Sequence, residues 1–273
     1  MAFGGETADS YYDEGLTASM KGDLAKAVQS FEKAIQLDYT HLAAMHQLGR
    51  CYMRIGQGQR AVEMLTRAVA KRPEQVPSRL DLGYALLAVG RTQEARKCFE
   101  YAVDMEPNNP RGMIGLAHTC FHEANWIGAM RHAQASLQFG APNFAALYIL
   151  GRAAKLAGDI ETSLMALNQA DAQIQKSVEL HPDDPEGYYL RGEIAFVRED
   201  FVSALDQFRT AETRAQTKKY YFAYGENFTS LDALAKQALC YQRLGADDRA
   251  KAIGVEIVRQ DPTHRIGNAL KNL

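Results

Sequence analysis

Residues 48–73 read LGRCYMRIGQGQRAVEMLTRAVAKRP. The pair Leu48-Gly49 returns as Leu82-Gly83, and it returns again in the same phase as Leu150-Gly151. After each of the first two pairs an alanine, a large apolar residue and a second alanine follow at the same spacing. They are Ala61, Leu65 and Ala68 in one block and Ala95, Phe99 and Ala102 in the next. A fixed period of this length, roughly 34 residues, indicates an array of repeated units, each of which buries its apolar face against its neighbours.

The period continues along the chain with two changes of phase. Gly151 and Gly192 are separated by one period and seven further residues, and seven residues make two helical turns. We therefore place the first insertion inside the second helix of the fifth block. A second, longer insertion follows the sixth block and is rich in aromatic residues. The predicted repeats lie near residues 8–41, 42–75, 76–109, 110–143, 144–184 (extended second helix), 185–230 (aromatic insertion) and 231–264, with a cap over 263–273.

Proline and glycine occur where pairs of helices would have to end. All eight prolines fall between the proposed repeats, so none interrupts a predicted helix. A glycine also stands seven residues after the first marker in five of the blocks, where the left-handed residue at the end of a helix favours glycine. We expect the turn between the two helices of a block at Gly22, Gly56, Gly90, Gly158 and Gly245.

Together these residues resemble the tetratricopeptide repeat, in which W-x-x-L-G-x-x-Y, A-x-x-x-F and P recur over about 34 residues. The resemblance covers residues 8–264. It implies an all-α fold, a right-handed superhelix (α-solenoid) of about seven helix-turn-helix repeats with a C-terminal capping helix, in a single domain over residues 1–273. We expect Ile266, Leu270 and Leu273 to share the face of the cap that covers the last repeat. The cap is short, which leaves open that the chain is one domain of a longer protein.

Composition excludes several classes of protein. The formal net charge is -2, which argues against a protein that mainly coats nucleic acid or an anionic membrane. The start of the chain lacks a basic stretch followed by an apolar run, and no window approaches the length of a membrane span. The four cysteines have no paired spacing, as in proteins of reducing compartments. We expect a cytoplasmic protein that makes no use of a membrane.

The sequence offers no catalytic or cofactor motif. Residues 56–61 read GQGQRA and match G-x-G-x-x-A, but a dinucleotide site needs this motif between a strand and a helix. Here it falls at the turn between two predicted helices. The chain contains no phosphate-binding loop, nucleophile elbow or H-E-x-x-H motif. We expect no enzyme, no catalytic residues and no cofactor.

Two further motifs are set aside. His118 and His122 are four residues apart and share a helix face, as two metal ligands would, but a third ligand is missing. We predict no metal and assign both histidines to the lining of a groove. Asn227-Phe-Thr229 is a glycosylation sequon, which has meaning only in a secreted chain.

The resemblance places the ligand groove on the first helix of each pair, at its second, fifth, ninth, twelfth and thirteenth positions. In blocks two to five no Asp or Glu occupies these positions, whereas blocks one, six and seven supply several acids. The middle of the groove is therefore expected to be basic and aromatic. The predicted peptide-binding residues are Arg50, Arg54, Tyr84, His118, His122, Tyr148, Arg152 and Lys155.

Two functional sub-classes of the family lack support. Chaperone-tail binders use a clamp of Lys and Asn, and no Asn stands at the ninth positions here. Superhelices of the glycosyltransferase type carry an asparagine immediately before the Leu-Gly pair. In this chain that position holds other residues, among them Gln47 and Asp81.

These observations predict a non-enzymatic scaffold that binds a peptide or protein segment, acidic by preference, in a basic and aromatic groove. One alternative is a polyanion or nucleic-acid binder that uses the same arginines. Another is the regulatory or substrate-presenting domain of a larger enzyme. The aromatic insertion holds Tyr220, Tyr221, Phe222, Tyr224 and Phe228. We expect these rings to pack on the lengthened helix before them, and a lid or a homo-oligomer contact is the alternative, with the cap as the other candidate for self-association.

Overall fold

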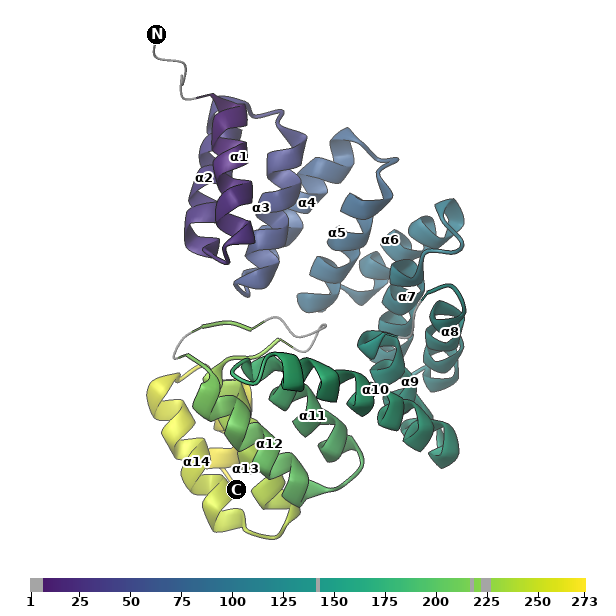
Figure 1. Ribbon diagram of the computed structural model, residues 1–273, viewed down its shortest axis with the longest axis vertical. Helices are drawn as coiled ribbons and strands as arrows, with labels where there is room; N and C mark the ends of the chain where they lie inside the picture. The colour runs from purple at the N-terminus through teal and green to yellow at the C-terminus, as the bar shows by residue number, and fades with distance from the viewer. Residues whose placement is uncertain (1–6, 141–142, 217–218, 222–226) are drawn as a thin grey trace. The chain divides into compact units, whose positions relative to one another are not determined.

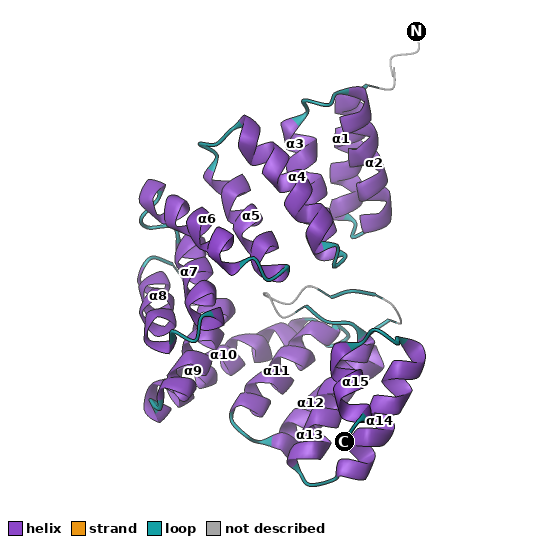
Figure 2. Ribbon diagram, turned by 180° about the vertical axis from the view of Figure 1, so that it is seen from behind, coloured by secondary structure: helices purple, strands orange, loops and turns teal. Residues whose placement is uncertain are grey.

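The computed structural model describes residues 7–140, 143–216, 219–221 and 227–273. These residues form fifteen α-helices, and their sole β-type pairing is one antiparallel bridge between Tyr221 and Phe228 (Figures 1 and 2). The chain divides into two compact units, Met1–Ala141 and Pro142–Leu273. The all-α fold of paired helices that the repeat predicts is confirmed.

Unit 1 (Met1–Ala141) holds four helix pairs. In each pair the two helices pack side by side, and each second helix also packs on the first helix of the next pair. We use "inner face" for the side of a unit formed by its first helices. The helices of unit 1 are α1 (Ala8–Met20), α2 (Leu24–Leu37), α3 (Leu42–Arg54), α4 (Gly58–Lys71), α5 (Val76–Ala88), α6 (Thr92–Met105), α7 (Pro110–His122) and α8 (Trp126–Gln138).

Unit 2 (Pro142–Leu273) holds three helix pairs and a final single helix. Its second helix α10 has 21 residues, seven more than the 14 of α12 and α14, so the insertion extends this helix by two turns. The helices of unit 2 are α9 (Phe144–Ala157), α10 (Ile160–Leu180), α11 (Pro185–Val197), α12 (Phe201–Arg214), α13 (Ser230–Arg243), α14 (Asp247–Gln260) and α15 (Arg265–Lys271).

The turns inside the pairs share one backbone conformation. Each of the five predicted glycines has a positive φ between 76° and 84°, as a left-handed turn residue requires. The two remaining pairs place Ala124 (φ 56°) and Glu199 (φ 66°) at the same point, although a left-handed conformation is costly for a residue with a Cβ atom. The turn geometry is thus kept in all seven pairs, with or without glycine.

Small residues on the first helices make room for large residues on the second helices. Phe99 of α6 is fully buried, and a Cβ atom added to Gly83 of α5 would lie 2.7 Å from its ring. A Cβ added to Gly115 of α7 would lie 2.2 Å from the same ring. The Phe99 ring therefore fills space that two glycines leave open, one in its own pair and one in the next pair.

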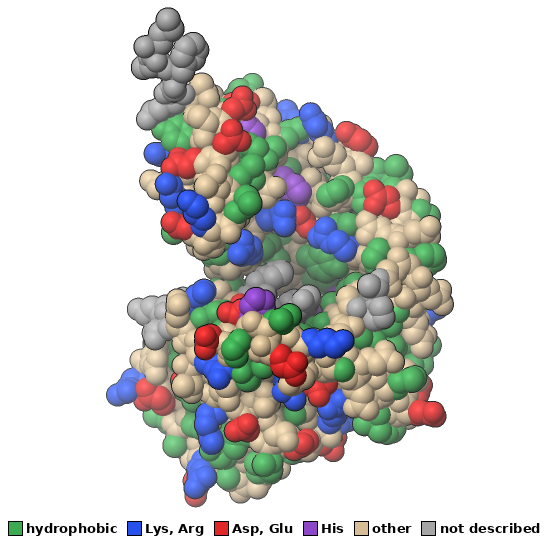
Figure 3. Space-filling view, viewed as in Figure 1, with side chains coloured by type: hydrophobic (Ala, Val, Ile, Leu, Met, Phe, Trp, Pro, Cys, Tyr) green, Lys and Arg blue, Asp and Glu red, His purple; other side chains and the backbone are tan. Residues whose placement is uncertain are grey.

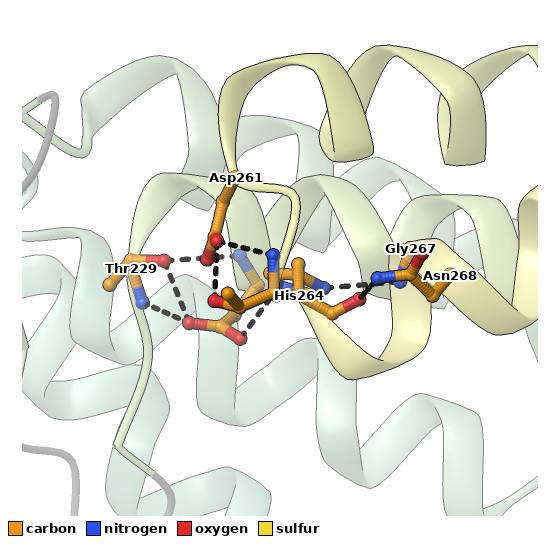
Figure 4. Close-up of polar contacts among 7 residues, drawn as sticks. Thr229, Asp261, His264, Gly267 and Asn268 are labelled. Atoms are coloured by element: carbon orange, nitrogen blue, oxygen red, sulfur yellow. Dashed lines mark hydrogen bonds and ion pairs between the residues drawn. The ribbon is translucent and has the colours of Figure 1, made fainter.

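The last helix covers the end of unit 2 through polar and apolar contacts (Figure 4). His264 caps α15: its Nδ1 accepts from the Gly267 amide at 3.1 Å, and its Nε2 lies 3.2 Å from Oδ1 of Asp232 in α13. Leu270 is buried and Ile266 is partly buried, as predicted for the cap. Leu273, however, lies beyond the end of α15 and is 46% exposed, so its assignment to the covering face was wrong.

Candidate functional site

A single carboxylate organises the inner face of unit 1. Asp81 of α5 lies between the helices on either side of it, with its Oδ2 2.8 Å from His46 Nε2 of α3 and its Oδ1 2.5 Å from Arg111 Nη2 of α7. Arg50 of α3 approaches the same carboxylate, with its Nε 3.7 Å from Oδ2. Side chains from three consecutive first helices thus converge on one acid, and we call these four residues the Asp81 cluster.

The charge on Asp81 is stabilised by its neighbours. Burial alone would raise its pKa, but the hydrogen bond from His46 and the positive charge of Arg111 hold the pKa below its ordinary value. The carboxylate is therefore ionised at neutral pH and orients the two arginines. Its side chain is 14% exposed, whereas those of Arg50 and Arg111 are 56% and 51% exposed. The cluster presents positive charge to solvent and keeps its negative charge inside.

Other cations surround the cluster on the inner face of unit 1. Arg54, at the end of α3, lies with its Nη1 3.5 Å from Ser19 Oγ of α1. Helices α3, α5 and α7 together carry no carboxylate besides Asp81. In Figure 3, Lys, Arg and His side chains gather over α3 and α5. On its inner face, unit 1 thus places His46, Arg50 and Arg111 around one acid.

Tyr84 belongs to the framework of this face. Its hydroxyl donates to the backbone carbonyl of Arg111 at 2.8 Å, and its ring meets Phe99 edge-on at 5.0 Å. Burial raises the pKa of the Tyr84 phenol, so it stays a neutral donor. These contacts link α5 to α7 and fix the backbone at Arg111.

His118 and His122 lie on α7, the first partly buried and the second exposed. Among the residues that the structure describes, no three His, Cys, Asp or Glu side chains come together as metal ligands would. Glu123, the nearest acid in sequence, forms an ion pair with Arg96 of α6. That His118 and His122 line a ligand groove stays a prediction.

The three predicted residues of unit 2 are engaged within that unit. Tyr148 of α9 is buried, and its hydroxyl donates to Oε2 of Glu193 in α11 at 3.1 Å. The Arg152 guanidinium lies 5.1 Å from the centre of the Tyr148 ring. Lys155 binds the Val197 carbonyl and lies 2.8 Å from Oε1 of Glu199.

Glu193 of α11 is the buried acid on the inner face of unit 2; it directly follows Gly192, whereas Asp81 stands two residues before Gly83. It is 5% exposed, and its Oε1 lies 2.6 Å from Lys236 Nζ of α13. Tyr148, Glu193 and Lys236 therefore join three first helices through one buried carboxylate, and we call them the Glu193 cluster. In contrast to the Asp81 cluster, this group buries its polar atoms.

Comparison with known proteins agrees with the repeat architecture. Family models described as tetratricopeptide repeat match residues 18–82 and residues 80–142 and 167–218. The chain belongs to the tetratricopeptide repeat family.

Related tetratricopeptide proteins match parts of the chain. Human Tetratricopeptide repeat protein 6 is 26% identical over 192 residues, which cover 69% of this chain and 35% of that protein. The chain thus spans about a third of the length of this relative. The Photosystem I assembly protein Ycf3 of Synechococcus sp. (strain CC9605) is 24% identical over 143 residues, covering 47% of this chain and 79% of that protein.

Solved tetratricopeptide structures share the fold. A tetratricopeptide repeat protein from Parabacteroides merdae ATCC 43184 superposes with a TM-score of 0.65 over 97% of this chain and 98% of that chain, at 15% identity. Residues from 41 onward of MamA from Desulfovibrio magneticus RS-1 give a TM-score of 0.56 over 63% of this chain and 97% of that chain, at 17% identity. At these identities the likeness shows the fold alone.

Sequence reasoning did not assign Asp81 to the site. It considered this position only as a slot for asparagine, one residue before Leu82-Gly83. A signal was available, since the residue before each Leu-Gly pair lies on the first helix close to the groove positions. Its three partners come from α3 and α7, and contacts between residues in different repeats become visible only once the helices are packed.

The aromatic insertion contacts α11 through Phe228, whereas the prediction named the lengthened helix α10. Phe228 stacks on Tyr189 of α11, with ring centres 3.9 Å apart. Tyr221 is buried as well, while Phe222 and Tyr224 lie outside the described residues. In the sequon that begins at Asn227, the Thr229 amide and hydroxyl both donate to Asp232 Oδ2 at the start of α13.

Among the described residues, no helix has the length and apolar character to cross a membrane.

Proposed function

We propose that this protein is a non-enzymatic scaffold that binds an acidic segment of a partner protein on the inner face of unit 1. Proteins of the tetratricopeptide family mediate contacts between proteins, and the family supports this coarser statement. The finer statement is supported by one observation. Arg50 and Arg111 are both more than half exposed, and one inward carboxylate orients them.

The chemistry of these side chains favours a carboxylate ligand. A guanidinium offers a planar pair of donors that fits a carboxylate, and Asp81 leaves part of each guanidinium directed to solvent. A face that concentrates cations attracts anions more strongly than the net charge of -2 suggests. We propose Arg50, Arg54, Arg111, His118 and His122 as ligand contacts and Tyr84 as their support.

The three predicted residues of unit 2 have a different role in this proposal. Tyr148, Arg152 and Lys155 interact with one another or with Glu193 and Glu199. We propose that they stabilise the packing of unit 2. This assignment leaves the binding of an acidic segment to unit 1.

Two alternatives are retained because they predict different measurements. A nucleic-acid or polyanion binder would use the same arginines, but its affinity would fall much more steeply with salt. A regulatory or substrate-presenting domain of a larger enzyme would bind a segment of that enzyme. The four cysteines, all buried and unpaired, support our placement of the protein in a reducing compartment such as the cytoplasm.

The experiment compares charge removal on two faces of unit 1. The full chain is titrated at two salt concentrations against three fluorescent ligands. These are glutamate-rich peptides with one tyrosine, lysine-rich peptides of the same length and a single-stranded oligonucleotide. The variant Arg50→Gln with Arg54→Gln should weaken binding of the acidic peptide at least tenfold. The control Lys71→Gln with Arg72→Gln removes the same charge from exposed positions at the end of α4 and should leave binding within twofold.

The outcomes separate the proposals. Equal losses in both variants would show a response to net charge alone and would contradict a site on the inner face. Preference for the oligonucleotide, with a steep salt dependence, would favour the polyanion alternative.

A further inference from the structure

The inner face of unit 2 carries a contact that the proposed function does not use. Phe228, in the connection between α12 and α13, stacks on Tyr189 of α11 with an interplanar angle of 1°. Phe228 is fully buried and Tyr189 is 3% exposed. Tyr189 holds the fifth position of its block, one of the positions that the family resemblance assigns to ligand contact. A groove position in unit 2 is therefore already covered.

The two ends of this segment are fastened to each other. The Tyr221 amide donates to the Phe228 carbonyl at 2.8 Å, and the Phe228 amide donates to the Tyr221 carbonyl at 3.0 Å. The Tyr221 ring stacks on Phe228 at 5.2 Å, and the Tyr221 hydroxyl accepts from the Gln216 amide at 2.8 Å. Three rings in series, Tyr189, Phe228 and Tyr221, thus attach this bridged pair of residues to α11.

Charge complements the aromatic contact. Glu186 stands three residues before Tyr189, one helical turn away on α11. Burial raises the pKa of Glu186, and the positive charge of Lys219 acts against this rise. The Lys219 ammonium lies 4.9 Å from the centre of the Tyr221 ring. Phe228 therefore offers its ring to Tyr189, and Lys219 adds a positive charge beside the Tyr221 ring.

We propose that the inner face of α11 is a binding site for a segment with lysine and aromatic side chains, and that this chain's own residues 219–221 and 227–229 occupy it. The segment is tethered to α12 and α13, so its effective concentration at the site is high, on the order of millimolar or more. An external peptide must compete with it. This inference stands on contacts within unit 2 and does not depend on the acidic-segment site of unit 1.

The test supplies the segment as a separate molecule. A labelled peptide with the sequence of residues 217–229, TKKYYFAYGENFT, is titrated with the full chain and with the variant Tyr221→Ser, Phe228→Ser, in which the tethered copy loses its rings. We expect the variant to bind the peptide at least tenfold more tightly than the wild type. The same peptide with Phe228→Ser should lose at least tenfold in affinity for the variant.

A matched control and a folding check accompany the titration. The control Tyr39→Ser, Phe139→Ser removes the same residue types from exposed positions of unit 1 and should behave as the wild type. Circular dichroism checks that each variant keeps its helical content. Equal binding of the peptide to the wild type and the variant, or binding to neither when both are folded, would overturn the proposal.

A second variant keeps the test decisive if Tyr221→Ser, Phe228→Ser fails to fold. In Tyr189→Ala the segment keeps its own sequence but loses its platform on α11. Hydrogen exchange at the Tyr221 and Phe228 amides should then become at least tenfold faster than in the wild type, with α13 still protected. Unchanged exchange at these two amides would show that the segment is ordered without α11, against the proposal.

Discussion

Asp81 in unit 1 and Glu193 in unit 2 each join three consecutive first helices from the middle one. Their surroundings differ in one respect. Asp81 is paired with Arg50 and Arg111, which are more than half exposed. Glu193 is paired with Tyr148 and Lys236, of which Tyr148 is 3% exposed and the Lys236 side chain 22% exposed. The first acid orients charges that solvent or a ligand can reach, while the second satisfies donors inside the unit.

A carboxylate on the inner face can therefore serve binding or packing, depending on whether its partner cations are exposed or buried. A half-exposed guanidinium keeps much of its hydration, so leaving it without a partner costs little free energy. A nearly buried ammonium or carboxylate is costly to leave unpaired. Stability should consequently depend far more on the Glu193 cluster, and ligand affinity far more on the Asp81 cluster.

The largest expected effect is on the Glu193 cluster. Lys236→Ala leaves the Glu193 carboxylate buried without its cation, and we expect the free energy of unfolding to fall by about 3 kcal/mol. Urea denaturation followed by circular dichroism measures this. The control Lys251→Ala on the exposed side of α14 should change stability by less than about 0.5 kcal/mol.

A second substitution separates the charge from the packing. Combining Glu193→Gln with Lys236→Met removes both charges, and this variant should recover more than half of the stability lost in Lys236→Ala. If Lys236→Ala costs no more than Lys251→Ala, the contrast between the two clusters fails.

Substitution in the Asp81 cluster should change stability less and ligand affinity more. Asp81→Asn removes the acceptor charge but leaves Arg50 and Arg111 hydrated, so we expect a loss of about 1.5 kcal/mol in stability. It also raises the positive charge of the inner face, and the affinity for the glutamate-rich peptide should rise about fivefold. Binding titrations test this, with Asp104→Asn, on an exposed position of α6, as the control for net charge. A fall in affinity would show that orientation of the two arginines by Asp81 matters more for binding than the positive charge gained.

The pH dependence of stability follows from the same carboxylate. Because the folded-state pKa of Asp81 is lowered, its contribution is fully present above the unfolded-state pKa and is lost as the pH falls through the folded-state pKa. The difference in unfolding free energy between wild type and Asp81→Asn should therefore be constant near neutrality and shrink below about pH 4. A difference that stays constant down to about pH 2 would exclude this origin.

The smallest effect concerns the two turns without glycine, one in each unit. Ala124→Gly relieves a left-handed conformation at φ 56° and should stabilise the protein by about 1 kcal/mol, measured as a rise in Tm. Glu199→Gly relieves the same strain at φ 66° but also removes the partner of Lys155, so its gain should be smaller. Gly90→Ala, at an equivalent turn with φ 78°, is the opposite control and should be destabilising. Equal gains in the two variants would show that the Lys155–Glu199 pair contributes nothing.

Much of the architecture was predictable because it depends on residues that recur at fixed spacing. Gly83 and Phe99 belong to the two helices of one repeat, and the structure packs the ring of one against the bare backbone of the other. The glycines at the turns were predicted from spacing, and their positive φ angles confirm the prediction. Ala124 and Glu199 were not predicted, because the packing of the two helices imposes the turn even where the local residue disfavours it.

The candidate site was only partly predictable. The register identified Arg50 and Arg54 as residues of the first helices, and Arg50 is exposed there. It could not show that Asp81 would bind both Arg50 and Arg111, since these three residues lie in three different repeats. Nor could it show that Tyr148 would be buried, because Glu193 reaches it from 45 positions along the chain.

The sequence by itself determined the helix pairs, their turns and the excess of cations on α3, α5 and α7, since periodicity and glycine act locally or between adjacent repeats. The tertiary structure decided which of those cations remain exposed and which groove position the chain covers with its own Phe228. Both outcomes depend on side chains from different repeats meeting at one point, and no single repeat carries that information.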